Sequence, residues 1–434
     1  MAQIRQVRTK GWWQTVGLFA TLHFLVDALC ASCLYLMVPE VSSAGLAVIF
    51  ILYNVLAFLP QPLTGMLADR VRRREELLAL AVALLALGVA TSSLAFLSLL
   101  VPVAGACLLG MGNSLFHVVG GRQVAVASGN DIRALGVFVS TGAMGLAVGV
   151  VFHSWSLLFA LLLGLAAGAM VSGPLSTTWH GRRASSALSS HFVWLAVLAL
   201  MGAVMLRSLT GETFGRALPK GAAMMLLAGG VAMLGKAGGG WLARWIGIVW
   251  SLLLVVAGVA LIMLASADSV PLLGLFVVNL TMAVTLFLAN AVMPGREGLA
   301  FGLLAAALMP GYLLAQTGAA GDIVPGLLLT LVPTIVIELC VLWLLRERRA
   351  DVLWSSVVVN ILTNVPLNLF VTFVSGSLSA IVVAEVLVVA VETLWYRYFA
   401  DSWHQALTYS FLCNAISFLI GVLCQLLMKL FAIL

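Results

Sequence analysis

The sequence contains very little charge. Only 9% of its 434 residues are Asp, Glu, Lys or Arg, whereas 63% are hydrophobic, and the mean hydropathy is +1.15. Soluble globular proteins carry about 25% charged and about 45–50% apolar residues. The composition therefore excludes a soluble enzyme or a soluble binding module. It predicts an integral membrane protein surrounded by membrane lipids, and we expect it in a bacterial cytoplasmic membrane.

Cysteines and enzyme motifs are scarce as well. The six cysteines lie inside apolar runs, where no secreted domain needs a disulfide framework. Cys30 and Cys33 form one Cys-x-x-Cys without a second pair, which indicates a zinc or redox site only weakly. The chain has no His-Glu-x-x-His, no Gly-x-Ser-x-Gly and no nucleotide-binding glycine loop. We therefore expect no enzyme activity, no catalytic residue, no cofactor and no metal.

Basic residues exceed acidic ones, which gives a net charge of +6 and a pI near 9.2. Most of them occur in short loops between apolar runs, so they indicate membrane topology and not binding to nucleic acid. With a cytoplasmic N-terminus, 18 of the 22 Lys and Arg residues fall on the inner side, and only Arg207, Arg216, Lys220 and Lys429 fall outside. This bias predicts a cytoplasmic N-terminus and a C-terminus outside.

Apolar runs of the length that spans a bilayer, about 20 residues, divide the chain. They predict two six-helix halves, residues 11–173 and 191–345, joined by a cytoplasmic linker at 174–190. About three extra transmembrane helices follow in residues 352–434, a segment of no recognised family. The expected spans are 13–38, 44–68, 76–96, 99–119, 134–155, 157–173, 191–208, 221–242, 246–265, 271–292, 299–315, 325–345, 352–373, 379–399 and 403–431. The predicted fold class is an all-α membrane bundle.

A charged turn follows the second span. It runs Gly65-Met66-Leu67-Ala68-Asp69-Arg70-Val71-Arg72-Arg73-Arg74. In form it resembles the loop between helices two and three of major facilitator transporters, Gly-x-Leu-Ala-Asp-Arg-x-Gly-Arg-Arg, with Arg72 in place of the second glycine. The resemblance implies that Gly65, Asp69, Arg70, Arg73 and Arg74 form a conformational gate that stabilises one transport state. The alternative is an ordinary short, positively charged loop.

A second copy of this turn occurs at Gly240-Trp241-Leu242-Ala243-Arg244-Trp245-Ile246-Gly247. Arg244 replaces the acid and Trp245 replaces the first arginine, so this copy keeps the shape of the turn and loses its charge pair. Internal symmetry of this kind is typical of transporters built from two parallel repeats. It supports a major-facilitator-type bundle of two six-helix halves.

His23 and Asp27 stand four residues apart in the first span and therefore share one face of a helix. A carboxylate at that depth is costly, so such residues face the bundle interior, a partner or a water path. We expect the pair to bind and release a proton. The alternative is a structural hydrogen-bonded pair that fixes the first helix to the bundle.

The same pair, together with Gly110-Met111-Gly112-Asn113-Ser114-Leu115-Phe116-His117 in the fourth span, is similar to the fosmidomycin-resistance branch of drug exporters. That branch carries His-x-x-x-Asp in helix one and Gly-x-Gly…Phe-His in helix four. The resemblance covers about residues 11–349 and implies a proton-coupled exporter of small molecules. Because helices one and four of such transporters line the central path, it makes His117 and Arg122 candidate partners of Asp27. The alternative for His117 is a hydrogen bond to a neighbouring helix.

Charged residues of the second half give weaker signals. Glu338 lies within the twelfth predicted span, and it is a further candidate for contact with substrate or proton. Lys236 is expected to extend along the apolar surface to the membrane interface. Arg207, Glu212 and Arg216 are expected in a solvated loop at the outer mouth.

The C-terminal segment combines hydrophobicity with regularly spaced polar groups. Asn360, Asn364 and Asn368 recur every four residues, and Glu385 and Glu392 are seven apart, so each set shares a helix face. They predict a buried polar network. Interhelical hydrogen bonding is its first interpretation, and an ion or lipid-headgroup site is the alternative. The segment is also a candidate docking unit for a protein partner or a second copy.

These features predict a secondary active transporter that moves a small organic molecule by alternating access, with proton-coupled efflux as the leading mode. A lipid or lysolipid transporter is the alternative within this class. A non-transporting membrane scaffold or receptor with a C-terminal docking unit is the alternative from a different class, because the second turn has lost its charge pair.

Overall fold

The computed structural model of the chain divides into two compact units. The first comprises residues 1–258 and 265–315, and the second comprises 259–264 and 316–434. The described residues are 11–38, 42–71, 74–94, 100–172, 190–264, 270–316, 334, 337–349, 352–353, 355–356, 359–360, 363–364, 367 and 378–433. All regular secondary structure in these residues is helical, which confirms the predicted all-α fold class.

Some predicted elements cannot be located. Arg73, Asn368 and residues 174–189 of the predicted linker lie outside the described residues, as does the side chain of Arg74. Division by internal packing assigns the described residues of 316–345 to the second unit, and the expected domain limits stay a prediction.

The first half of the bundle contains seven α-helices and one short 3-10 helix among the described residues. They are α1 (Trp12–Leu36), α2 (Ser43–Phe58), α3 (Gln61–Arg70), α4 (Arg74–Ser93), α5 (Leu100–Ser128), α6 (Ile132–Val151), η2 (His153–Trp155) and α7 (Ser156–Ser172). Helices α2 and α3 form one span that is interrupted at Leu59 and Pro60. Pro60 lacks the N–H that would continue the hydrogen-bond ladder, and Pro62 occupies the first turn of α3, where that loss is tolerated.

The second half follows the same plan with more interruptions. Its described helices are α8 (Ser190–Arg216), α9 (Ala222–Ile246), α10 (Ile248–Leu264), α11 (Val270–Asn279), α12 (Thr281–Val292), α13 (Glu297–Ala306) and α14 (Leu308–Gln316). Helix α8 ends at Arg216 and not at Ser208, so the expectation of an outer loop at this point is wrong. Arg207 and Glu212 lie within a membrane-length helix because the apolar run simply continues around them.

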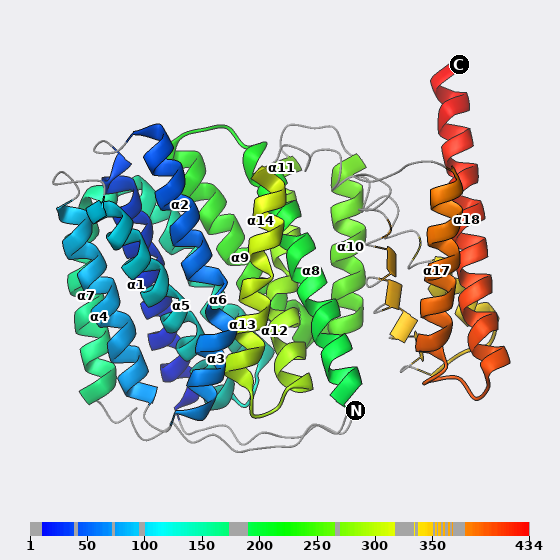
Figure 1. The fold of residues 1–434 in the computed structure, drawn as a ribbon, viewed down its shortest axis with the longest axis horizontal. Helices are drawn as coiled ribbons and strands as arrows, with labels where there is room; N and C mark the ends of the chain where they lie inside the picture. The colour runs from blue at the N-terminus through cyan, green and yellow to red at the C-terminus, as the bar shows by residue number, and fades with distance from the viewer. Residues whose placement is uncertain are drawn as a thin grey trace. The chain divides into compact units, whose positions relative to one another are not determined.

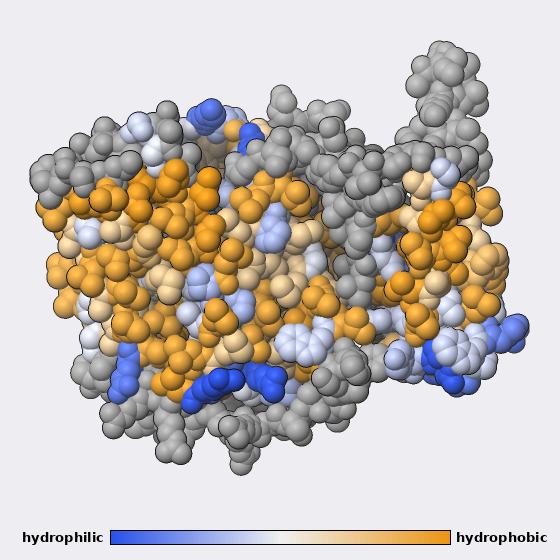
Figure 2. Space-filling model, viewed as in Figure 1, coloured by the Kyte–Doolittle hydropathy of each residue, from blue (hydrophilic) through white to orange (hydrophobic). Residues whose placement is uncertain are grey.

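Ten helical stretches among the described residues are long and apolar enough to cross a membrane. The helices of the first unit lie roughly alongside one another (Figure 1). Figure 2 shows that the visible face of this unit is mostly hydrophobic across its middle, with hydrophilic residues near its upper and lower edges. This distribution is what a bilayer requires, and the chain is an integral membrane protein.

Helix α6 is the shared element of the first unit, because it packs closely against α1 of its own half and α9 of the other. Gly145 and Gly149 lie against the backbone of Phe24 and Ala28 on α1. On the other side, Gly136 of α6 lies against the backbone of Lys236 on α9. Without a hydrophobic driving force between helices in lipid, small residues that allow such close approach hold the bundle together.

The second unit contains α17 (Leu378–Tyr396) and α18 (Trp403–Ile433), which pack side by side. Glu392 of α17 lies at the centre of a buried polar network. It accepts hydrogen bonds from Thr363 Oγ1 at 2.9 Å and from Asn414 Nδ2 on α18. Half-buried Glu385 interacts with it electrostatically.

The network reaches Glu338 through two amides. Asn364 Nδ2 donates to Asn360 Oδ1 at 2.9 Å, and Asn360 Nδ2 donates to Glu338 Oε2 at 2.6 Å. Glu338 is fully buried. The structure therefore joins Glu338 to the C-terminal polar residues in one chain of hydrogen bonds.

A second polar contact of this unit lies in the loop at residues 347–349. The Glu347 carboxylate accepts hydrogen bonds from the Arg348 and Arg349 backbone N–H groups, from the Arg349 guanidinium at 2.9 Å and from Tyr409 Oη at 2.8 Å. These donors, the Arg349 guanidinium first, lower the pKa of Glu347 from 4.5 to about 2. The loop is thereby fixed to α18.

This contact predicts an acid-sensitive contribution to stability. A depressed pKa in the folded state means that the contribution is present above pH 4.5 and is lost as the pH falls toward about 2. We expect Glu347→Gln to lower the free energy of unfolding by about 1–2 kcal/mol at pH 7, and this deficit to shrink below pH 4.5. Thermal unfolding in detergent across pH measures it. Asp401→Asn, which removes an exposed acid 3.7 Å from Arg349, is the control and should change little. A deficit that stays constant with pH would contradict the assignment.

Candidate functional site

Two residues of α1 begin the site. His23 and Asp27 lie one turn apart with Nε2 of the imidazole 3.3 Å from Oδ2 of the carboxylate. They are 4% and 6% exposed, so both side chains lie inside the bundle and not against lipid. Asp27 also receives a hydrogen bond from Asn113 Nδ2 on α5 at 3.2 Å. The same amide donates to Tyr53 Oη on α2 at 3.0 Å, so three helices converge on the carboxylate.

His117 completes the cluster from α5. Its Nε2 atom lies 3.6 Å from Asp27 Oδ1, opposite His23. The two imidazole rings meet edge to face with centroids 4.5 Å apart. Asn113 and Tyr53 belong to this cluster although the sequence did not point to them. Asn113 stands in the quoted motif one helical turn before His117, and this spacing was the available signal.

The backbone determines which nitrogen of each imidazole carries the proton. His23 Nδ1 lies 2.7 Å from the Phe138 carbonyl oxygen, and His117 Nδ1 lies 2.9 Å from the Asn113 carbonyl oxygen. A carbonyl only accepts, so both Nδ1 atoms must donate. In the neutral imidazole Nε2 is then an acceptor facing a carboxylate, which is also an acceptor. A favourable contact therefore requires an additional proton between Asp27 and at least one of the two rings.

Gly142 of α6 makes room for this arrangement. A Cβ atom at this position would overlap Asp27 Oδ2 and His23 Nε2. The carboxylate and the imidazole thus lie directly against the backbone of α6. Any side chain here would displace the pair from His117.

The cluster also has the composition of a metal site. The ligand atoms of His23, Asp27 and His117 all lie within 4.8 Å of one another. Two imidazole nitrogens and a carboxylate oxygen are a set that suits a divalent transition metal such as Zn²⁺. A cation and a proton would compete for the same Nε2 lone pairs.

Arg122 does not join the cluster. It lies five residues beyond His117 on α5, about 7.5 Å further along the helix axis. Its Nε donates to Asp69 Oδ1 at 2.8 Å, and both side chains are buried. Of the two residues proposed as partners of Asp27, the structure therefore brings His117 to the carboxylate and takes Arg122 to the charged turn.

Asp69 links the two halves of the bundle. Besides Arg122 on α5, it accepts hydrogen bonds from the Gly298 and Leu299 backbone N–H groups at 3.0 and 2.9 Å. These groups belong to the first turn of α13, where the helix presents unpaired donors and a partial positive charge. Gly65 lies directly against the backbone of Gly298, which permits the approach. Arg70 is exposed and takes no part in this contact.

The second copy of the turn makes the symmetry-related contact without the charge. Gly240 of α9 lies against the backbone of Ile132 at the start of α6, as Gly65 lies against α13. Arg244, in the position of Asp69, is exposed. The N-terminus of α6 is capped by Asp131, whose Oδ1 accepts from the Arg133 N–H at 3.0 Å. Both copies therefore connect one half to the other.

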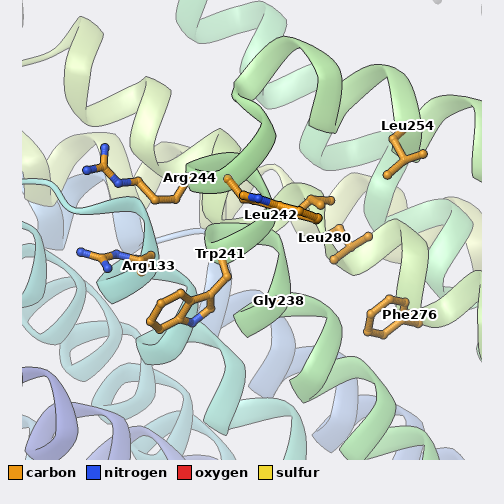
Figure 3. Close-up of a pocket in the computed structure, with 9 residues that line it drawn as sticks. Arg133, Gly238, Trp241, Leu242, Arg244, Leu254, Phe276 and Leu280 are labelled. Carbon is orange, nitrogen blue, oxygen red and sulfur yellow. The ribbon is translucent and has the colours of Figure 1, made fainter.

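One cavity of the first unit borders the second copy of the turn, and its wall includes none of His23, Asp27 and His117. It measures about 740 Å³ and is lined by Arg133, Trp241, Arg244 and apolar side chains of α9, α10 and α11. Figure 3 shows Arg133 and Arg244 beside Trp241, and the Arg133 guanidinium lies 5.1 Å from the Trp241 ring. Trp245 is 85% exposed, so this is an open groove on the outside of the bundle.

Comparison with solved structures identifies the fold. A variant of the fucose:proton symporter FucP of E. coli superposes with a TM-score of 0.56 at 14% identity, over 72% of this chain and 94% of that chain. FucP in an outward conformation, described as a major facilitator superfamily transporter, superposes with a TM-score of 0.53 at 14% identity, over 72% of this chain and 92% of that one. No family model and no curated protein sequence matches the chain. The chain therefore has the fold of major facilitator transporters, while the fosmidomycin-resistance branch stays a prediction.

Gly142→Ala tests the packing beneath the cluster. The added methyl group should displace Asp27 and His23 and lower the free energy of unfolding by about 1–3 kcal/mol, although alanine is the better helix former. Thermal unfolding in detergent measures this. Gly164→Ala on α7, where a Cβ meets nothing, is the matched control and should be neutral or stabilising. Equal effects of the two substitutions would contradict the close approach.

Asp69→Asn tests the link between the halves. Arg122 would be left buried without its counter-ion, which we expect to destabilise this conformation by about 3–5 kcal/mol. Arg70→Gln, at the exposed neighbouring position, should stay within about 0.5 kcal/mol of the unmodified chain. Indistinguishable unfolding midpoints for the two variants would show that Asp69 does not compensate the buried charge of Arg122.

Proposed function

We propose that the protein is a proton-coupled secondary transporter that moves a small organic molecule across the membrane by alternating access. The observation that carries the proposal is the position of Asp27 between two imidazoles whose Nδ1 atoms are already committed to backbone carbonyls. This geometry retains an exchangeable proton inside the bundle. The fold supplies two halves between which a central site can be exposed alternately.

Loss and gain of this proton provide the coupling. With the proton present, the carboxylate attracts an imidazolium, and α1 and α5 are drawn together through Asp27, His23 and His117. Without it, acceptor atoms face each other at 3.3 and 3.6 Å and repel. Protonation therefore changes the relative energies of two helix arrangements, and this difference is what a proton gradient needs in order to drive transport.

The charged turn sets the second requirement. In this structure Asp69 closes the seam between α3 and α13, on the side that the distribution of basic residues predicts to be cytoplasmic. Substrate can leave on that side only when these bonds break. The resemblance to drug exporters supports export as the direction, with the proton moving inward in exchange.

Asp27→Asn tests the coupling. The amide cannot hold a proton between the two rings, so transport driven by a pH gradient should be lost while the chain still folds. Reconstituted vesicles with and without a proton gradient, screened across a substrate panel, measure this. Glu392→Gln is the matched control, because it neutralises a buried, hydrogen-bonded acid of the second unit and should leave gradient-driven transport intact.

Substrate counterflow separates the alternatives. Exchange without a gradient that persists in Asp27→Asn would show a carrier uncoupled from protons, as the proposal requires. Unchanged gradient-driven transport in that variant would remove Asp27 from the mechanism. A chain that exchanges no molecule of the panel, including lysolipids, would favour the scaffold.

A further inference from the structure

A cavity of about 300 Å³ lies in the second half of the first unit, away from the external groove. Helices α8, α9, α11 and α12 contribute most of its wall, and α14 closes it. The wall combines two cationic side chains with apolar ones. Its principal members are Arg207, Glu212, Lys236, Leu275, Asn279 and Met282.

Arg207 is buried in this wall, and only 8% of the residue is exposed. Its Nη1 atom has no hydrogen-bond partner among the described residues. Among the described residues no carboxylate lies within ion-pair distance of it. A guanidinium in such a place is costly, because no acid among the described residues compensates its lost hydration.

Lys236 approaches the same cavity from α9. It is half-buried, and it makes no hydrogen bond or ion pair with the part of the chain that the structure describes. Its ammonium group is repelled by Arg207 and attracted by Asp27, the carboxylate that lies between His23 and His117. Two like charges are thus held at one cavity beside the site of proposed coupling.

The other polar groups of the wall are already engaged. Ser208 Oγ donates to the Leu308 carbonyl at 2.9 Å, and Asn279 Nδ2 donates to the Leu275 carbonyl at 2.7 Å. Glu212 interacts with Arg216, one turn further along α8. The cationic donors that stay available to a ligand are therefore those of Arg207 and Lys236, and the second N–H of Asn279 Nδ2 adds a neutral one.

We propose that this cavity binds the anionic group of a small organic molecule, a carboxylate or a phosphate, between Arg207 and Lys236. An anion would supply, within ion-pair distance, the negative charge that neither Arg207 nor Lys236 receives from the described residues. Leu275 and Met282 would contact the apolar part of the ligand, and the volume lies at the lower end of the range for small-molecule sites. The inference rests on the proposed function and names its substrate class, an amphipathic organic anion.

Binding and unfolding measurements on the purified full chain test this site without any gradient. Benzoate and phenylphosphonate are the anionic probes, and benzamide is the uncharged match. We expect both anions, and not benzamide, to bind and to raise the unfolding temperature. Arg207→Gln should weaken anion binding about tenfold or more. Lys236→Gln should weaken it in the same direction.

The sign of the stability change separates a binding role from a structural one. Without added anion, Arg207→Gln should raise the unfolding temperature by about 2–4 °C, because it removes a buried charge that has no partner. Arg244→Gln, on the same helix as Lys236 but exposed, is the control and should alter neither quantity. A lower unfolding temperature with undiminished benzoate affinity would make Arg207 structural and overturn the proposal. Failure of the unmodified chain to bind either anion would overturn it too.

Two further comparisons complete the test. One distinguishes a lipid headgroup from a free solute as the source of the anion, and the other distinguishes failure of the anion site from failure of proton coupling. Benzoate binding that is present in phosphatidylcholine nanodiscs and competed away in phosphatidylglycerol nanodiscs would assign the site to a lipid headgroup. Equal binding in both would assign it to a free solute. Because these measurements use no gradient, anion binding can stand even where the Asp27→Asn experiment refutes proton coupling, and the reverse also holds.

Discussion

An ionised side chain inside hydrocarbon has to be compensated, and the first unit compensates Asp27 and Asp69 in different ways. Asp69 faces an arginine, which keeps its charge at any physiological pH, and the N-terminus of α13. Asp27 faces two histidines, whose imidazoles can be neutral or protonated. The first arrangement therefore keeps its charge pair at any physiological pH. The second is the arrangement to which the proposed function assigns proton exchange.

The glycines of α6 connect the Asp27 cluster to helix α9 of the second half. Gly142 places Asp27 and His23 against the α6 backbone, and Gly136 places Lys236 of α9 against the same helix on its other side. Close backbone packing leaves few intermediate positions, so a change at α1 is transmitted as a shift of packed helices and not absorbed by side chains. Helix α6 is accordingly the element through which the cluster of His23, Asp27 and His117 can act on the second half.

The sequence predicted the helical class, the repeated turn and the ionisable pair of α1, because apolar run length, charge spacing and helix periodicity are local properties. It did not predict that Arg122 pairs with Asp69 and not with Asp27. Both acids lie within reach of α5, and only the tertiary arrangement decides between them. It also placed Arg207 in a loop. Charged residues normally end a span, and the exception here is visible only once α8 is seen to continue to Arg216.

The two copies of the turn differ in what happens when the seam between the halves opens. The α6 N-terminus is capped by Asp131, which belongs to the same half and can stay with it. The α13 N-terminus has no side-chain cap of its own and relies on Asp69 from the other half. Asn290 of α12 donates to Asn130 just before α6, which places both contacts at the same end of the bundle. Opening at this end would break the Asp69 cap and the Asn290–Asn130 hydrogen bond, and it would leave the Asp131 cap of α6 intact.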